Sequence, residues 1–111
     1  MKLFYALKSS YAFGLGFLLL ISQSVWAEGN LAAAETKKSM CVGCHGIAGY
    51  QSSFPEVYSV PYIGGQSAEY LKAALAAYKK GDRKHPTMNA IAQSLSEQDI
   101  ADLATYYSQV N

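Results

Sequence analysis

Residues 40–46, of sequence MCVGCHG, contain both cysteines of the chain and one of its two histidines. Two thiols three positions apart can close a disulfide, bind a metal, exchange disulfides or attach a cofactor. Each of these uses makes a different demand on the rest of the fold. This short segment therefore constrains the structure more than any other feature of the sequence.

The N-terminal segment, residues 1–27, differs in character from the rest of the chain. Lys2 and Lys8 precede an apolar run of about a dozen residues, and Ala27 closes a small-residue pattern typical of a cleavage site. This order predicts a secretory signal that is cleaved after Ala27. A retained membrane anchor is the alternative, but a span needs about 20 apolar residues, and the polar residues 22–24 interrupt the run too early.

Removal of the signal leaves residues 28–111, which we expect to form one domain of 84 residues. They keep seven of the nine basic and all eight acidic residues, so their net charge is −1 rather than the +1 of the whole chain. A nucleic-acid-binding protein would need a strongly basic face, so this charge balance gives no indication of nucleic-acid binding. A domain of this size has a marginal core, and a disulfide between neighbouring cysteines would stabilise it little. The fold therefore needs another stabilising element.

The helical pattern predicts an all-α fold with three main helices. Residues 30–41 are rich in alanine and have Asn30 as a plausible N-cap. The second helix, residues 67–81, begins at Ser67 and stops at Gly81. Its apolar face repeats at helical spacing.

The last helix has the clearest signals. Ser96 is a candidate N-cap, and Asp99 stands three residues on, as in a capping box. Its predicted buried stripe consists of Ile100, Leu103, Ala104 and Tyr107. The segment 46–66, between the first two helices, shows no strand-like alternation and is expected to be a loop that packs against a ligand or serves the function.

The histidine that follows the second cysteine separates the possible uses of the motif. A thioredoxin-like pair is disfavoured because no βαβ pattern surrounds it. A zinc site would have to recruit His85, about 40 residues away and outside the usual spacings, whereas a plain oxidised pair stays possible. C-x-x-C-H is the attachment pattern of haem c: Cys41 and Cys44 would add to the vinyl groups and His45 would bind the iron. We therefore predict one covalently bound haem c per chain, whose apolar macrocycle supplies the missing core.

The other axial position of the iron has several candidate ligands. Met88 lies in a Pro-containing segment read as a loop, and a thioether there would favour reversible electron transfer at a raised potential. Met40 is on the same helix as Cys41 and is expected to pack in the core. His85 is the rival ligand, but it precedes Pro86 and is expected to be an exposed loop residue. An open position would instead indicate gas binding or peroxidase chemistry.

With these motifs in order, the chain resembles the class I c-type cytochromes, in particular small bacterial monohaem proteins and single domains of dihaem relatives. The resemblance rests on CVGCHG, VPYIGGQSAEYL and YKKGDRKHPTMNAIAQSLSEQDIADLATYYSQ, which cover most of residues 28–111. It implies the small cytochrome c fold, with three main helices and loops wrapped around one haem. The first and last helices would cross through small residues such as Ala33 and Ala34.

The resemblance also implies roles for individual residues. Met88 would be the distal iron ligand. The carbonyl group of Pro61 would accept the Nδ1 proton of His45 and fix its tautomer. Gly64 and Gly65 would let the backbone pass close to the haem edge.

The function implied is that of a periplasmic one-electron carrier that cycles between Fe(III) and Fe(II) and is not an enzyme. Redox partners could dock on a basic rim formed by Lys72, Lys79, Lys80, Arg83 and Lys84. An alternative is an electron-accepting subunit of a larger dehydrogenase complex, with the loop aromatics Tyr50, Phe54, Tyr58 and Tyr62 as a contact patch. A haem sensor or peroxidase with a labile Met88 is the third possibility.

Overall fold

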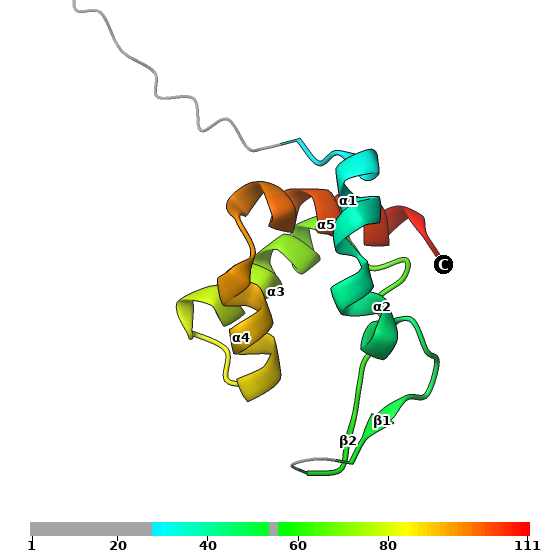
Figure 1. The fold of residues 1–111 in the computed structure, drawn as a ribbon, viewed down its shortest axis with the longest axis vertical. Helices are drawn as coiled ribbons and strands as arrows, with labels where there is room; N and C mark the ends of the chain where they lie inside the picture. Colours follow the sequence, from blue (N-terminus) through cyan, green and yellow to red (C-terminus); the bar gives the residue numbers. More distant parts are fainter. Residues whose placement is uncertain (1–27, 54–55) are drawn as a thin grey trace, which may run out of the picture.

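The computed structural model of the chain describes residues 28–53 and 56–111, so the predicted signal, residues 1–27, and Phe54 lie outside the described residues. The described part contains five helices and two short strands (Figure 1). In chain order they are α1 (Leu31–Lys37), α2 (Ser39–His45), β1 (Gln51–Ser52), β2 (Tyr58–Ser59), α3 (Ala68–Lys80), α4 (Pro86–Ser94) and α5 (Glu97–Gln109). The predicted all-α class is confirmed. None of the helices in these two ranges has the length and apolarity of a membrane span.

The first predicted helix is present as two consecutive segments, α1 and α2, which meet at Lys38. Asn30 is the N-cap, as expected, and its side-chain oxygen accepts the backbone N–H of Ala33 at 3.1 Å. The helix continues past its predicted end and includes the whole cysteine motif up to His45. Cys41 and Cys44 therefore stand at i and i+3 of one helix, which places their side chains on one face.

Both predicted ends of α3 and the predicted start of α5 are confirmed. The Ser67 hydroxyl accepts the backbone N–H of Tyr70 at 3.3 Å, and Gly81 ends α3 in the left-handed conformation at φ +84°. Ser96 and Asp99 form the capping box, with reciprocal bonds of 2.8 and 3.1 Å. Such a cap stabilises a helix by about 1 kcal/mol.

Helix α4 corrects the prediction that Met88 and His85 lie in a loop. Pro86 occupies the first helical turn, where its missing N–H has no partner to lose. His85 is the N-cap, and its Nδ1 accepts the backbone N–H of Met88 at 3.3 Å. Good helix formers such as Ala90 and Ala92 then continue the helix. His85 is half-buried rather than exposed, and Met88 stands on the first turn of a helix.

The segment between α2 and α3 also differs from the prediction of a loop without strands. Strands β1 and β2 pair antiparallel, with Gln51 opposite Ser59 and Ser52 opposite Tyr58. Strands of two residues are too short to show the alternation by which strands are predicted. The hairpin lies beside the C-terminal end of α2 in Figure 1.

Helix α5 organises the core. It packs against α1 on one side and α3 on the other, and α3 also packs against α4. The buried stripe predicted for α5 is confirmed, because each of its four residues is at most 6% exposed. The central cluster consists of Leu71, Leu95, Ile100, Leu103, Ala104 and Tyr107.

The crossing of α1 and α5 depends on small residues, as the resemblance implied. Ala34 is completely buried there, and Ala33 is half-buried. Gly29 is part of the same crossing, although the sequence did not suggest it. A Cβ atom at Gly29 would collide with the side chain of Thr105 and the carbonyl oxygen of Ala101. The backbone at Gly29 therefore packs directly against α5.

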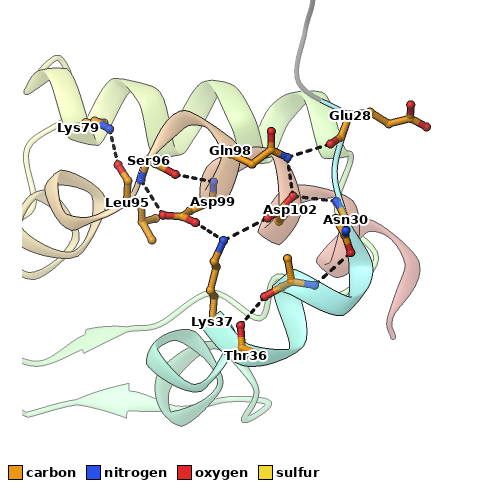
Figure 2. Close-up of polar contacts among 11 residues, drawn as sticks. Glu28, Asn30, Thr36, Lys37, Lys79, Leu95, Ser96, Gln98, Asp99 and Asp102 are labelled. Atoms are coloured by element: carbon orange, nitrogen blue, oxygen red, sulfur yellow. Dashed lines mark hydrogen bonds and ion pairs between the residues drawn. The ribbon is translucent and has the colours of Figure 1, made fainter.

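A buried carboxylate, Asp102, connects the N-terminal segment to α5 (Figure 2). Its side chain is 1% exposed. Oδ1 accepts the backbone N–H of Asn30 and Nε2 of Gln98, both at 2.8 Å, and Oδ2 lies 3.2 Å from Nζ of Lys37. Gln98 also donates to the carbonyl oxygen of Glu28 at 3.0 Å.

The two carboxylates that share Lys37 both have a lowered pKa. Burial alone would raise the pKa of Asp102, but the hydrogen bonds from Asn30, Gln98 and Lys37 outweigh it. Lys37, followed by the hydrogen bonds of Ser96, lowers the pKa of Asp99 to about 2. Both carboxylates are therefore charged at neutral pH, and Lys37, whose own pKa is raised chiefly by Asp99, is paired with both.

Candidate functional site

One cavity of about 370 Å³ brings the candidate residues together. Its apolar wall is contributed by α3, α4 and α5, with Leu71, Leu75, Ile91 and Leu103 among the lining side chains. Residues 58–61 and 63 close another side. The predicted apolar face of α3 points into this cavity, because Leu71, Ala74, Leu75 and Tyr78 all line it.

His45 is half-buried at the end of α2 and lines the cavity. Its Nδ1 lies 2.7 Å from the carbonyl oxygen of Pro61. A carbonyl oxygen only accepts, so Nδ1 carries the proton and donates it in this bond. The other ring nitrogen, Nε2, then keeps a lone pair with which it can bind a metal.

Cys41 and Cys44 line the same cavity and are free thiols. Cys44 is exposed, whereas Cys41 is half-buried against the core. Burial raises the pKa of the Cys41 thiol, and interaction with the Tyr107 hydroxyl opposes that rise. The thiol of Cys41 is therefore protonated near neutrality.

Tyr107 places a buried hydroxyl in the wall beside Cys41. The residue is 6% exposed, and its hydroxyl has no hydrogen bond of ordinary geometry within the described residues. Burial, followed by the neighbouring Cys41, raises the pKa of Tyr107 to about 12. The sequence predicted Tyr107 as a packing residue of α5 but gave no sign of this contact.

Met88 and His85 reach the cavity from α4, and Figure 1 shows α4 well separated from α2. Both residues are half-buried. The ring of His85 packs edge-on against Tyr58, with ring centroids 4.9 Å apart. Met40 is 45% exposed and is not among the residues that line the cavity, so the prediction that it packs in the core is wrong.

Pro61 lines the cavity, whereas Gly64 and Gly65 are not among its lining residues and lie against the C-terminal segment instead. The N–H of Gly65 donates to the carbonyl oxygen of Tyr107 at 2.9 Å, and its φ is +76°. A Cβ atom at Gly64 would meet the ring of Tyr62 at 2.8 Å. These glycines allow a close approach between the chain and the C-terminal segment.

The five candidate docking cations differ in their surroundings. Lys79 donates to the carbonyl oxygen of Leu95 and lies 3.5 Å from a carboxylate oxygen of Glu97. The guanidinium of Arg83 stacks 4.6 Å from the ring centroid of Tyr78. Within residues 28–53 and 56–111, no ion pair engages the remaining three, Lys72, Lys80 and Lys84.

The donor set around the cavity fits the haem c predicted from the sequence. Two thiols and an imidazole with a defined tautomer come from α2, and a thioether comes from α4. The apolar wall suits a macrocycle that is itself largely apolar. Within the described residues, the hydroxyl of Tyr107 is the buried side-chain polar atom of this wall that lacks a hydrogen-bond partner.

Comparisons with known proteins agree with this fit. A family model described as Cytochrome c matches residues 30–111. Cytochrome c-554(548) of Halomonas halodenitrificans is 45% identical over 83 residues, an alignment that covers 72% of this chain and 95% of that protein. The thiosulfate dehydrogenase electron acceptor of Stutzerimonas stutzeri is 38% identical over 73 residues. That match covers 63% of this chain but only 32% of the longer protein.

The fold is also similar to a solved structure. The crystal structure of reduced recombinant cytochrome c4 from Pseudomonas stutzeri superposes with a TM-score of 0.57 at 24% sequence identity. The superposition covers 77% of this chain and 52% of that chain, so this protein spans about half of it.

Proposed function

The chain belongs to the cytochrome c family, and on this basis we propose that it is a periplasmic one-electron carrier. Residues 1–27 would direct its export and be cleaved after Ala27. Residues 28–111 would form the whole monohaem domain. The family implies one covalently bound haem c and electron transfer rather than enzymatic turnover.

We assign the site residues from the cavity lining. Cys41 and Cys44 would form the thioethers, and His45 and Met88 would be the axial ligands of the iron. The observation that supports this assignment is that one cavity is lined by all four side chains, which come from two separate helices.

The chain holds and tunes the bound group. Haem c supplies a reversible one-electron couple when bound. The hydrogen bond from His45 to Pro61 holds the imidazole ring in place. It also makes the lone pair of Nε2 a stronger ligand for a metal. The apolar wall with Leu71 and Leu103 would keep water from one side of the bound group. We propose that Gly64 and Gly65 let the chain continue past the edge of the bound group.

The choice between Met88 and His85 as iron ligand can be tested by spectroscopy. The ferric protein is expected to show the weak band near the red end of its absorption spectrum that reports an iron–sulfur bond. Met88→Ala should abolish this band, because no other methionine of the described residues lines the cavity. His85→Ala should keep the band.

His85→Ala is the matched control for this experiment, because both side chains reach the cavity from α4 and its cap. A band that survives Met88→Ala would show that the ligand assignment is wrong. Absence of the band from the wild-type ferric protein would point to histidine ligation instead, because the band reports an iron–sulfur bond.

We further propose that redox partners dock beside the C-terminal end of α3. Lys80 and Lys84 are exposed there, and neighbouring Arg83 and Tyr78 line the cavity. A set of cations beside the cavity would attract acidic partner surfaces and speed their encounter. Lys79 contributes less to this attraction, because it is already bonded to Leu95 and Glu97.

A double charge reversal, Lys80→Glu with Lys84→Glu, tests this docking surface. The bimolecular rate of electron exchange with an acidic redox protein should fall by about tenfold or more at low salt, and its dependence on salt should become weaker. Stopped-flow absorption measures both quantities. Lys79→Gln is the control and should change the rate much less. Equal effects of the two variants would refute the assignment.

A second candidate role is that of an electron-accepting subunit of a dehydrogenase complex. A relative is described as a thiosulfate dehydrogenase electron acceptor and another as the cytochrome subunit of sulfide dehydrogenase. Exposed apolar side chains next to the site, Ile47 (49%), Val57 (73%) and Tyr62 (46%), would suit a permanent contact. Gel filtration of the native protein from its own cells would separate a free carrier from a bound subunit.

A further inference from the structure

A group of polar contacts acts on Met88 from outside the cavity. Asn89, the next residue of α4, uses its whole carboxamide on backbone groups. Nδ2 donates to the carbonyl oxygens of Tyr78 at 2.6 Å and Arg83 at 2.8 Å, and Oδ1 accepts the N–H of His85 at 2.8 Å. These groups belong to the last turn of α3, the following turn and the N-cap of α4. One side chain therefore ties three successive backbone segments together.

His85 completes this arrangement. Its Nδ1 accepts the backbone N–H of Met88 at 3.3 Å, and its carbonyl oxygen accepts the N–H of Asn89 at 2.8 Å. Its ring rests edge-on against Tyr58 of the hairpin. His85 and Asn89 thus each bond the backbone of the other, and the N–H of Met88 is bonded within the same turn.

Apolar packing anchors only the opposite end of α4. The buried residue of this helix is Ala92, close to its end, and Leu95 follows at 3% exposure. The first turn, which carries Met88, has no buried apolar side chain. A helix of nine residues is marginal by itself. The orientation of the first turn therefore depends on its polar contacts.

We propose that Asn89 is the positioning residue for Met88. Its three hydrogen bonds hold the first turn of α4 so that the Met88 thioether stays at the cavity. This inference rests on the proposed function, because it takes Met88 as the ligand of the iron. Without the carboxamide, the turn between α3 and α4 is free to move, and the thioether leaves the metal more often.

An external ligand measures this release. Imidazole can bind the ferric iron only in the fraction of molecules in which Met88 is displaced, so its apparent affinity follows that fraction. Removal of three hydrogen bonds, two of them part-buried, is expected to raise the apparent affinity of Asn89→Ala for imidazole about tenfold. The titration is followed by absorption on the ferric holoprotein.

Two controls separate positioning from general loss of stability. Ser94→Ala removes an exposed hydroxyl that bonds only within α4, to the carbonyl oxygen of Ile91 at 2.6 Å. Ser96→Ala weakens the cap of α5 and lowers the melting temperature without a contact to the first turn of α4. Both variants should bind imidazole within about twofold of the wild type. Asn89→Asp keeps the acceptor for His85 but loses both donors, and it should show an increase even if Asn89→Ala does not fold.

The outcomes distinguish the two proposals. If the red band is lost in Met88→Ala but both Asn89 variants bind imidazole as the wild type does, the positioning role is refuted and the ligand assignment stands. The positioning role is also refuted if Ser96→Ala raises the affinity as much as Asn89→Ala does. If Met88→Ala keeps the band, the ligand assignment is wrong and the positioning role is refuted with it.

Discussion

A Cys44→Ser variant is expected to lose its covalently bound haem and, with it, its folded structure. Without the haem, the apolar side chains that line the cavity of about 370 Å³, Leu71, Leu75 and Leu103 among them, would be left open to water. Exposure of this much core surface would cost a large part of the free energy of unfolding of a small domain. The chain should therefore unfold rather than keep an open cavity.

The measurement is haem staining after denaturing electrophoresis, together with far-ultraviolet circular dichroism of the purified protein. Ser39→Ala is the matched control, since Ser39 is an exposed residue of the same helix and does not line the cavity. It should keep full haem content and full helicity. An unchanged haem content in Cys44→Ser would refute the role of Cys44 in attachment.

Asp102→Ala is expected to lower the free energy of unfolding of the haem-loaded protein by about 3 kcal/mol. The substitution leaves the N–H of Asn30 without its acceptor and removes one of the two acceptors of the Gln98 amide. The loss is at the lower end for a buried ion pair because Lys37 keeps Asp99 as a partner. Denaturant titration followed by circular dichroism measures the change.

An exposed ion pair on the same side of the molecule gives the control. Glu35→Gln removes the partner of Lys38, and both side chains of that pair are substantially exposed, at 54% and 31%. The expected loss is below about 1 kcal/mol. A cost for Asp102→Ala no larger than that for Glu35→Gln would contradict a structural role of the buried carboxylate.

The same cluster gives the stability a defined pH dependence. Asp99 and Asp102 both have a pKa below the value of an unfolded carboxyl group. Their contribution is therefore complete above that ordinary value, near pH 4, and is lost as the pH falls toward about 2, the pKa of Asp99 in the folded protein. As the pH falls from about 4 toward about 2, the free energy of unfolding of Asp102→Ala should decrease less than that of the wild type.

The half of the site on α2 could be predicted from the sequence because its chemistry needs neighbouring residues. Cys41, Cys44 and His45 lie within five positions, so their pattern is visible without knowledge of the fold. Met88 could be selected as a candidate, but its setting could not. The segment with His85 and Pro86 reads as a loop, since histidine is an uncommon N-cap and its capping bond depends on the ring orientation.

The contacts that hold the fold together at its N-terminal end were beyond sequence reasoning for a different reason. Asp102 follows the helical pattern of a solvent-facing acid, and it is buried only because Asn30 and Lys37 cross over it. Gly29 shows its importance only through Thr105 on α5. Both depend on contacts between segments about 70 residues apart, which no local pattern encodes.

The wall of the cavity is also most of the hydrophobic core. Five of the six residues in the central cluster, namely Leu71, Leu95, Leu103, Ala104 and Tyr107, line the cavity as well. A polar substitution in this wall would shift the reduction potential by changing the polarity around the iron. The same substitution would weaken the packing of α3 against α5. Changes in these residues can therefore shift the reduction potential only as far as the core can lose stability. A wider change of potential would have to come from residues outside that wall.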